Sequence, residues 1–309
     1  MTGIIGSGFG LYGYMPAVLQ IDEKVFLLER TKEKFIQRKE LLCYEPSIFW
    51  AKNLDELLLS VDTLIISLPP QEQSTLLNTI LHYHNIKNLI LEKPVAVSPM
   101  ESENMLLSVF NQGINFRINY TFLKAEWLKE IENVILMNKG NQLSVFIQWH
   151  FKAHHYLTHV FNWKSNHDAG GGAIRFYGIH FIALATHLSF QKVSFSCANT
   201  TEKNVSTWLC KLNDAENNNL DIDIDTNSEI QAFSINIEVN GQGVYNYKTS
   251  SPFDEVPVYN SGLDKRIKGL SDLYLNLKSV NTSVELFNYY QNTNHLWASV
   301  ENTLKIKLS

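Results

Sequence analysis

The sequence lacks most features of secreted, metal-binding or nucleic-acid-binding proteins. It has three cysteines, Cys43, Cys197 and Cys210, which lie far apart and form no C-x-x-C pair. This spacing argues against a disulfide framework and against a zinc site. Basic residues number 26 against 31 acidic ones. The formal net charge of −5 therefore gives no electrostatic footprint for nucleic acid, and we expect no such partner.

Long apolar runs are also missing. No stretch of 18 apolar residues is present, so we expect no transmembrane helix and no membrane partner. The chain enters an apolar segment after one residue, without the basic start or cleavage site of a secretory signal. These absences predict a cytoplasmic protein. A chain of 309 residues exceeds the usual size of one hydrophobic core, which predicts two domains.

The first 118 residues alternate between short apolar runs and amphipathic segments. Runs of strand length end at Ile5 and cover residues 25–28, 63–68 and 88–91. Helical segments are expected at 31–42, from the capping box that begins at Asn53, at 71–84, and from Ser98 onward. Strands that alternate with helices predict a parallel sheet with right-handed crossovers. We therefore expect an α/β fold whose residues 1–118 form a Rossmann-type domain.

The pattern changes from residue 119. Apolar and polar residues alternate over 143–151 and, less regularly, over 230–239, which is typical of an antiparallel sheet with one covered face. The Asn- and Asp-rich stretch 213–227 is interpreted as a polar, solvated loop without the spacing of a calcium loop, and 283–305 as a helix. Residues 119–309 are thus predicted to form an α+β domain with an open, mostly antiparallel sheet.

A glycine-rich turn, Gly6-Ser7-Gly8-Phe9-Gly10, follows the first predicted strand. Gly6 permits a tight turn from strand to helix, and Gly8 allows the backbone to approach a pyrophosphate without an intervening Cβ. The helix N-terminus behind them supplies N–H donors and partial positive charge. The third glycine of the usual dinucleotide fingerprint is replaced by Leu11. The turn predicts a site for NAD or NADP.

Two charged residues, Glu29 and Arg30, end the second predicted strand. A carboxylate there can accept hydrogen bonds from the adenosine ribose and favours NAD, whereas an arginine can pair with a 2′-phosphate and favours NADP. A surface ion pair is the alternative. The choice of cofactor stays open at this point.

The strand 88–91 is followed by Glu92-Lys93-Pro94. Ligands of open α/β sheets bind beyond the carboxyl ends of the strands. A lysine at that edge can act as an acid or base when burial lowers its pKa, or it can orient a hydroxyl group. A solvent-facing charge is the alternative interpretation of Lys93.

Together these motifs resemble the glucose-fructose oxidoreductase and inositol dehydrogenase superfamily. The resemblance also covers motifs further along the chain: Met15-Pro16-Ala17, Pro69-Pro70, Glu92-Lys93-Pro94-Val95-Ala96, Asn119-Tyr120, Trp163, Gly170-Gly171-Gly172-Ala173 and Gly178-Ile179-His180. It implies hydride transfer between nicotinamide and a sugar or polyol carbon. It also implies a homo-oligomer, a dimer or tetramer, formed through the C-terminal sheet.

The resemblance places Lys93 and His180 beside the reacting hydroxyl as catalytic residues. The cofactor-binding residues that we expect are Gly6, Ser7, Gly8, Phe9, Gly10, Glu29, Arg30, Pro69, Gln73, Glu92 and Lys93. The expected contacts of a sugar-like substrate are Tyr120, Trp163, Arg175, Tyr177 and His180. Each of these aromatic residues, and His180 itself, could instead be an ordinary core residue.

The sequence departs from the family pattern at two positions. The family's aspartate, four residues before the histidine, is Phe176 here, and phenylalanine can neither accept a proton nor orient an imidazole. A histidine that commonly follows the two prolines is Gln73, which can still form hydrogen bonds near the nicotinamide ribose. Among the histidines between 150 and 167, His155 and His159 have helical metal-ligand spacing, but no carboxylate or cysteine accompanies them and we expect no metal.

Three functions are consistent with these motifs. The first is an NAD(P)-dependent oxidoreductase acting on a sugar, amino sugar or sugar nucleotide. The second is a lyase or hydrolase that uses the cofactor for a redox-assisted cleavage. The third is a dinucleotide-sensing binding protein without turnover, similar to the galactose-pathway co-repressor of the superfamily. The missing aspartate favours the third function, whereas the presence of both Lys93 and His180 favours the other two.

Overall fold

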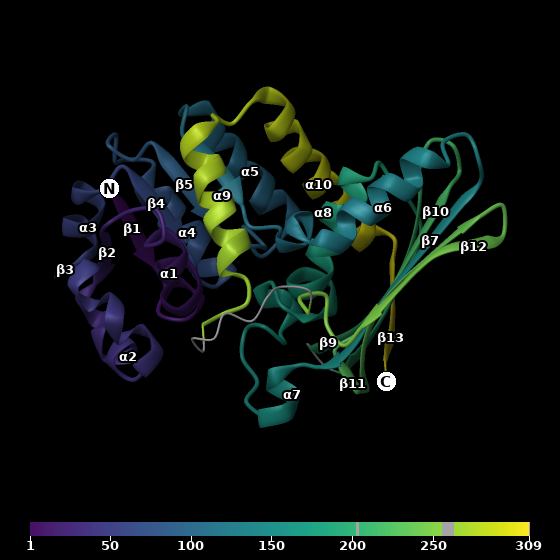
Figure 1. Ribbon diagram of the computed structural model, residues 1–309, viewed down its shortest axis with the longest axis horizontal. Coiled ribbons are helices and arrows are strands. Elements are labelled where there is room, and N and C mark those ends of the chain that lie inside the picture. The colour runs from purple at the N-terminus through teal and green to yellow at the C-terminus, as the bar shows by residue number, and fades with distance from the viewer. Residues whose placement is uncertain (202–203, 255–262, 309) are drawn as a thin grey trace. The chain divides into compact units, whose positions relative to one another are not determined.

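A computed structural model of the chain describes residues 1–201, 204–254 and 263–308 (Figure 1). These residues divide into two compact units. Unit 1 holds residues 1–96, 101–119 and 263–287, and unit 2 holds 97–100, 120–201, 204–254 and 288–308. The chain thus passes between units at Asn119 and Tyr120. It also returns to unit 1 late in the sequence, which the residue pattern did not indicate.

Unit 1 is built on a six-stranded parallel sheet with the order β3-β2-β1-β4-β5-β6. The strands are β1 (Thr2–Ile5), β2 (Val25–Leu28), β3 (Ile48–Ala51), β4 (Thr63–Ile66), β5 (Asn88–Leu91) and β6 (Asn115–Ile118). This arrangement confirms the Rossmann-type sheet. Strand β3 was not predicted, although Ile48–Ala51 is a short apolar run, and β6 was missed because the polar Asn115 and Arg117 interrupt its apolar residues. In β6 the polar Asn115 and Arg117 are buried, and Arg117 Nη2 donates to the Val280 carbonyl over 2.6 Å.

The helices of unit 1 follow the strands as expected. They are α1 (Met15–Val18), α2 (Lys32–Ile36), α3 (Leu54–Ser60), α4 (Pro70–Ile80) and α5 (Pro99–Asn111). The predicted cap of α3 is present, because the N–H of Glu56 donates to Asn53 Oδ1 over 2.9 Å. Helix α4 is shorter than the predicted segment 71–84 and ends at Ile80.

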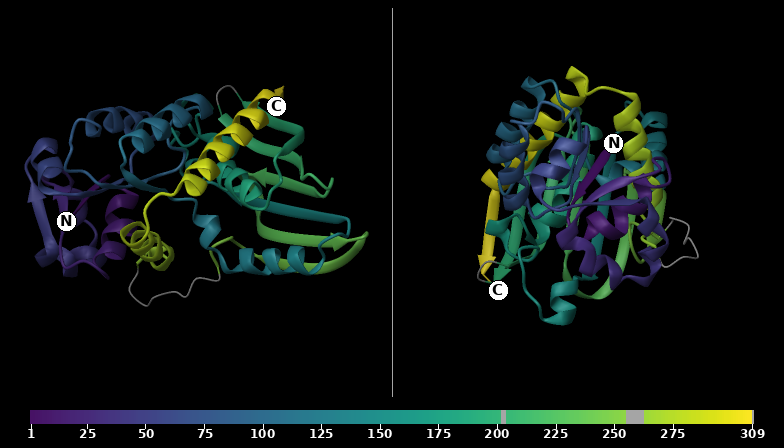
Figure 2. Two further views of the ribbon diagram at one scale, coloured as in Figure 1. Left: turned by 90° about the horizontal axis from the view of Figure 1, so that it is seen from above. Right: turned by 90° about the vertical axis from the view of Figure 1, so that its left-hand side faces the viewer.

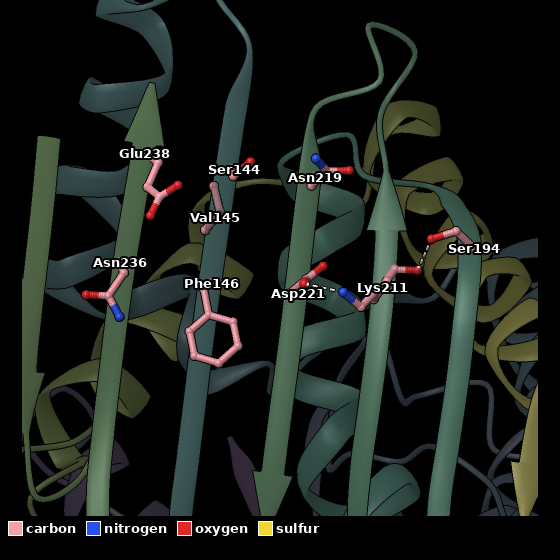
Figure 3. Close-up of a pocket in the computed structure, with 9 residues that line it drawn as sticks. All are labelled: Ser144, Val145, Phe146, Ser194, Lys211, Asn219, Asp221, Asn236 and Glu238. Atoms are coloured by element: carbon pink, nitrogen blue, oxygen red, sulfur yellow. Dashed lines mark hydrogen bonds and ion pairs between the residues drawn. The ribbon is translucent and has the colours of Figure 1, made fainter. Parts of the chain in front are cut away.

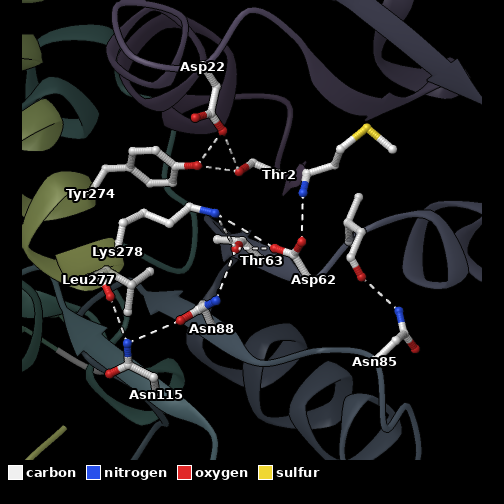
Figure 4. A network of polar contacts seen from close by, with 12 residues as sticks. Thr2, Asp22, Asp62, Thr63, Asn85, Asn88, Asn115, Tyr274, Leu277 and Lys278 are labelled. Carbon is white, nitrogen blue, oxygen red and sulfur yellow. Dashed lines mark hydrogen bonds and ion pairs between the residues drawn. The ribbon is translucent and has the colours of Figure 1, made fainter. Parts of the chain in front are cut away.

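A further helix of unit 1, α9 (Ile267–Ser279), comes from the late segment of the chain. Its apolar face belongs to the same buried core as Ile4 and Ile90. Polar contacts also secure this helix (Figure 4): the Tyr274 hydroxyl binds Asp22 and Thr2, and Lys278 Nζ donates to Thr63 Oγ1 over 3.0 Å. Helix α9 is therefore an integral part of unit 1.

Unit 2 contains a seven-stranded sheet with the order β12-β11-β7-β10-β9-β8-β13 (Figure 2). The strands are β7 (Leu143–Lys152), β8 (Lys192–Thr201), β9 (Asn204–Asn213), β10 (Asn219–Asp225), β11 (Asn227–Val239), β12 (Gln242–Thr249) and β13 (Leu304–Leu308). Four neighbouring pairs are antiparallel, whereas β7 with β10 and β8 with β13 are parallel. The sheet is thus mostly antiparallel, as predicted.

The interpretation of residues 213–227 as a loop was wrong, because β10 lies within this stretch. Leu220, Ile222 and Ile224 are buried, while the alternating aspartates point to the half-buried opposite face. The strand was missed because flanking asparagines obscured a short period-two pattern. Its acidic residues do lie on the more open face, as a solvated stretch would.

Helices α6 (Glu126–Met137) and α8 (Ile179–His187) pack on the apolar face of this sheet. Unit 2 also contains α7 (His154–Thr158), and α10 (Val284–Asn302) runs from unit 1 into unit 2 and confirms the helix predicted over 283–305. Trp127 of α6 packs against Phe233 of β11, with ring centroids 5.3 Å apart. Phe181 of α8 packs against Trp149 of β7 at 6.1 Å. Among the helices that the structure describes, none is long and apolar enough to cross a membrane.

Candidate functional site

Gly6 and Gly8 of the predicted phosphate turn have different surroundings in unit 1. Gly6 has a φ of +139°, and a Cβ on it would lie 2.2 Å from the carbonyl oxygen of Ser67, so only glycine fits. A Cβ on Gly8 would have no atom within 4 Å. Gly8 therefore faces open space, as the approach of a pyrophosphate to the backbone requires.

Phe9, another predicted cofactor contact of the turn, folds back onto the residues that follow it. Its ring lies 5.4 Å from that of Tyr12 and 5.3 Å from that of Tyr14. A Cβ on Gly13 would come within 2.4 Å of the Phe9 ring, which explains a glycine at this position. Gly10 begins the π-helical turn that leads into α1.

A pocket of about 300 Å³ lies beyond the carboxyl ends of β1, β2 and β4. It is lined by Ile5, Arg30, Leu54, Leu68, Gln71, Glu72, Thr75, Leu76 and Thr79. In doubly wound sheets the adenosine half of a dinucleotide binds at this edge, in a largely apolar pocket with a few polar groups. The residues present therefore fit an adenine nucleotide.

Charged side chains surround this end of the turn. Glu29 and Arg30 are both exposed directly after β2. Lys34 of α2 reaches the turn, where its Nζ donates to Ser7 Oγ over 2.9 Å. Lys34 was not singled out from the sequence, since a lysine in a charged helix carries no signal of its target. Two cations and one carboxylate thus lie at the expected adenosine end.

The Glu92 side chain is enclosed by donors in unit 1. Its Oε1 accepts from the Tyr14 hydroxyl over 2.5 Å and from Asn119 Nδ2 over 2.8 Å. Removal of the carboxyl group from solvent raises its pKa, and these hydrogen bonds together with the charges of Lys93 and Arg266 partly oppose that shift. Tyr14 and Asn119 are therefore site residues that the sequence alone did not assign.

Lys93 and Pro69 lie where the sequence predicted. Lys93 is half-buried two residues beyond β5, and Pro69 precedes the first residue of α4. Gln73 of α4 is completely buried, and its Nε2 donates to the carbonyl groups of Glu92 and Val95 over 2.8 and 3.0 Å. Gln73 thus holds the segment that carries Lys93. Its contact with a nicotinamide ribose stays a prediction.

In unit 2, His180 lies in the first turn of α8. It is 4% exposed, and its ring stacks on Phe122 with centroids 4.7 Å apart. Phe176 lies in the preceding π-helical turn, Ala173–Gly178, and its ring meets Trp163 edge-on at 5.2 Å. The position at which the motif resemblance implied an aspartate therefore has an aromatic packing role here.

The other predicted substrate contacts also lie in unit 2. Tyr177 packs against Trp149 at 5.6 Å, and burial raises the pKa of its hydroxyl group. Burial raises the pKa of Tyr120 as well, which is 5% exposed. Arg175 forms two hydrogen bonds with Glu301, of 2.6 and 2.7 Å. This pair gives Arg175 a structural partner, and its contact with substrate stays a prediction.

The histidine-rich segment does not form a two-ligand helix face. Helix α7 ends at Thr158, and His159 follows it in the left-handed conformation, with φ 55°. Across residues 1–201, 204–254 and 263–308, no group of three or more His, Cys, Asp or Glu side chains could hold a metal ion.

A second hollow of about 300 Å³ lies on the open face of the sheet in unit 2 (Figure 3). Its lining is mostly polar and includes an ion pair of 2.9 Å between Lys211 Nζ and Asp221. Phe146 projects into the same face and is 38% exposed. This face carries none of the residues predicted to bind cofactor or substrate.

Comparisons with known proteins agree with the geometry of unit 1. Residues 1–120 match the model of a family described as "Oxidoreductase family, NAD-binding Rossmann fold". A search of curated proteins found no match to the chain.

Solved structures share the fold of the whole chain. KijD10, a 3-ketoreductase from Actinomadura kijaniata in complex with NADP and TDP-benzene, has a TM-score of 0.75 at 13% identity. The match covers 100% of this chain and 98% of the KijD10 chain. The WlbA dehydrogenase from Bordetella pertussis, in complex with NADH and UDP-GlcNAcA, has a TM-score of 0.71 at 13% identity, with coverage of 97% and 95%. The dehydrogenase MviM from Clostridium difficile has a TM-score of 0.67 at 15% identity, with coverage of 97% and 98%.

Proposed function

Because residues 1–120 match the model of an oxidoreductase family with an NAD-binding Rossmann fold, we propose that this chain is an NAD(P)-dependent oxidoreductase. It transfers a hydride between nicotinamide and a carbon of a sugar, amino sugar or sugar nucleotide. The observation that carries the proposal is the open Gly8 turn beside an adenosine-sized pocket at the carboxyl edge of the parallel sheet. The nucleotide-linked ligands of KijD10 and WlbA support the substrate class.

The glycine turn and the pocket of unit 1 bind the dinucleotide in this proposal, and the bound nicotinamide accepts or supplies the hydride. Lys93 and His180 act on the substrate hydroxyl: one exchanges its proton, and the other polarises the same oxygen. His180 as the proton-exchanging group is our first assignment, and the reversed roles are the alternative. Both assignments rest on the motif resemblance. The stack of His180 on Phe122 keeps its imidazole in a fixed plane.

The proposal is tested by measuring substrate reduction with NADPH and with NADH. The absorbance of the reduced nicotinamide reports the turnover. We expect Lys93→Ala and His180→Ala each to lower kcat by about 100-fold or more, in the range attributed to general acid–base catalysis. Lys87, at the other end of β5, and His187, at the end of α8, provide matched controls. If Lys93→Ala or His180→Ala left turnover unchanged, the mechanism would be refuted. Calorimetry that detects no binding of NAD or NADP would refute the cofactor assignment.

A dinucleotide-sensing protein without turnover is the second candidate, favoured by the aromatic Phe176 in place of an acid. A redox-assisted lyase or hydrolase is the third. Tight binding of NAD(P)H without turnover of any sugar nucleotide would favour the sensor, and product formation without net change in nicotinamide absorbance would favour the lyase or hydrolase.

A cytoplasmic homo-oligomer is part of the same proposal. The open face of the seven-stranded sheet, with the exposed Phe146 among polar neighbours, is the proposed contact between copies. Sedimentation of the wild-type protein and of Phe146→Asp tests it: we expect a dimer or tetramer that dissociates in the variant.

A further inference from the structure

An arginine from the late segment of unit 1 lies against the glycine turn. Arg266 immediately precedes α9, and its guanidinium stacks on the ring of Phe9, with its Cζ atom 4.1 Å from the ring centroid. Phe9 is part of the turn whose neighbour Gly8 faces open space. A contact of this kind between a guanidinium and an aromatic ring fixes the plane of the cation.

Asp264 holds the same guanidinium from its own loop. Arg266 Nε and Nη2 donate to the two carboxylate oxygens over 2.8 and 2.7 Å. The carboxylate raises the pKa of Arg266, although burial acts in the opposite direction. A guanidinium has five N–H donors in a planar fork, so one arginine can bind a carboxylate and a phosphate together. The ion pair therefore orients Arg266 without excluding an anionic ligand.

The charges around the turn favour a cation at this position. A dinucleotide diphosphate carries two negative charges, and the carboxyl group of Glu92 acts electrostatically on Arg266 from the end of β5. Tyr12 and Tyr14 also act electrostatically on the guanidinium. At the opposite end of the turn, Lys34 contacts Ser7. Two cations from separate helical segments thus contact side chains of one glycine turn.

We propose that Arg266 is a cofactor-binding residue, whose guanidinium binds the diphosphate of NAD(P) at the Phe9 side of the glycine turn. The inference rests on the proposed function, because it concerns the same cofactor site. Asp264 and Phe9 are positioning residues for this cation. The late segment of the chain then contributes directly to dinucleotide affinity and not only to the core of unit 1.

The test measures binding of NADPH, NADH, ADP-ribose and adenosine to the full-length wild-type protein and to Arg266→Gln. The first three probes carry a diphosphate, and adenosine carries none. We expect the substitution to weaken the three diphosphate ligands by about 10- to 100-fold, as for loss of a charged hydrogen bond, and to leave adenosine within twofold. The dependence of Kd on salt becomes weaker, because one cation is lost.

Three further variants separate this role from a structural one. Arg266→Lys keeps the charge but loses the fork, so an intermediate loss is expected. Asp264→Asn loosens the orientation of the Arg266 guanidinium and should weaken binding of the diphosphate ligands a few-fold. Lys268→Gln removes an exposed cation of α9 and leaves every Kd within twofold. Equal weakening of adenosine and ADP-ribose by Arg266→Gln, or no weakening of either, overturns the inference while the proposed function stands. Failure of the wild-type protein to bind any dinucleotide overturns both.

Discussion

The side chain of Gln73 and the backbone of Glu92 form a closed pair of hydrogen bonds. Gln73 Nε2 donates to the Glu92 carbonyl over 2.8 Å, and the Glu92 N–H donates to Gln73 Oε1 over 3.0 Å. The same Nε2 donates to the Val95 carbonyl. One buried side-chain amide of α4 therefore fixes the backbone before and after Lys93.

Replacement of Gln73 by leucine removes these bonds and leaves buried backbone groups without the amide. We expect the free energy of unfolding to fall by about 2–4 kcal/mol, given 1–3 kcal/mol for each unsatisfied group. We also expect kcat to fall more than the affinity for NAD(P)H, since Lys93 loses its position. Asn78→Leu, at an exposed amide of the same helix, is the control. Denaturant unfolding and steady-state kinetics measure the two effects. An unchanged kcat in a folded variant would show that Gln73 does not position Lys93.

Gly6 and Gly8 of the turn predict different effects of the same substitution on stability. Gly6→Ala forces a Cβ to within 2.2 Å of Ser67 O at positive φ, so it destabilises unit 1 as well as abolishing cofactor binding. Gly8→Ala meets no protein atom and should change stability by less than about 0.5 kcal/mol. It should still weaken NAD(P)H binding by at least tenfold, because its methyl group occupies space that the diphosphate needs. Thermal unfolding with and without cofactor distinguishes the two variants. A stable Gly8→Ala protein with normal affinity would contradict the assignment of the turn.

The cations at the adenosine end predict a preference for NADP. Arg30 lines the pocket and Lys34 reaches Ser7, and both can interact with a 2′-phosphate. We expect NADPH to bind more tightly than NADH. Arg30→Gln and Lys34→Gln should each lower this ratio by about tenfold, as expected for one charge-assisted hydrogen bond. Lys24→Gln, at an exposed lysine before β2, should not change it. Fluorescence titration with both cofactors gives the ratio, and a wild-type preference for NADH would assign the dominant role to Glu29.

The raised pKa of Glu92 predicts a pH-dependent effect on stability. Because the carboxyl group is harder to ionise in the folded state than in the unfolded state, the folded protein loses stability as pH rises through the pKa of Glu92. Glu92→Gln removes this loss while its carbonyl can still accept from Tyr14 and Asn119. The variant should therefore unfold at a higher temperature than the wild type at pH 8, with the difference vanishing near pH 4. Glu33→Gln, at an exposed carboxylate of α2, should show no such crossover. If Glu92→Gln is less stable than the wild type at pH 8 and this difference shrinks at pH 4, the pKa of Glu92 is lowered in the folded state and not raised.

The sequence predicted those features that depend on local residue order. The glycine turn, the capping box at Asn53 and the strand ends near Arg30 and Lys93 are properties of neighbouring residues, and the structure places them in the expected elements. Residues brought together by distant segments were missed. Arg266 carries no local signal of its contact with Phe9. Strand β6 was missed because its buried Arg117 depends on partners near Val280.

The contribution of α9 to unit 1 determines when the core of this unit can be completed during synthesis. The ribosome produces all six strands of the parallel sheet before residue 119, but Leu270, Tyr274 and Leu277, which complete their core, emerge only after strands β7 to β12 of the other sheet. A nascent chain released at residue 118 would leave the apolar surface under α9 open to solvent and to chaperones. Dinucleotide binding should therefore become detectable only when nearly the full-length polypeptide has left the ribosome.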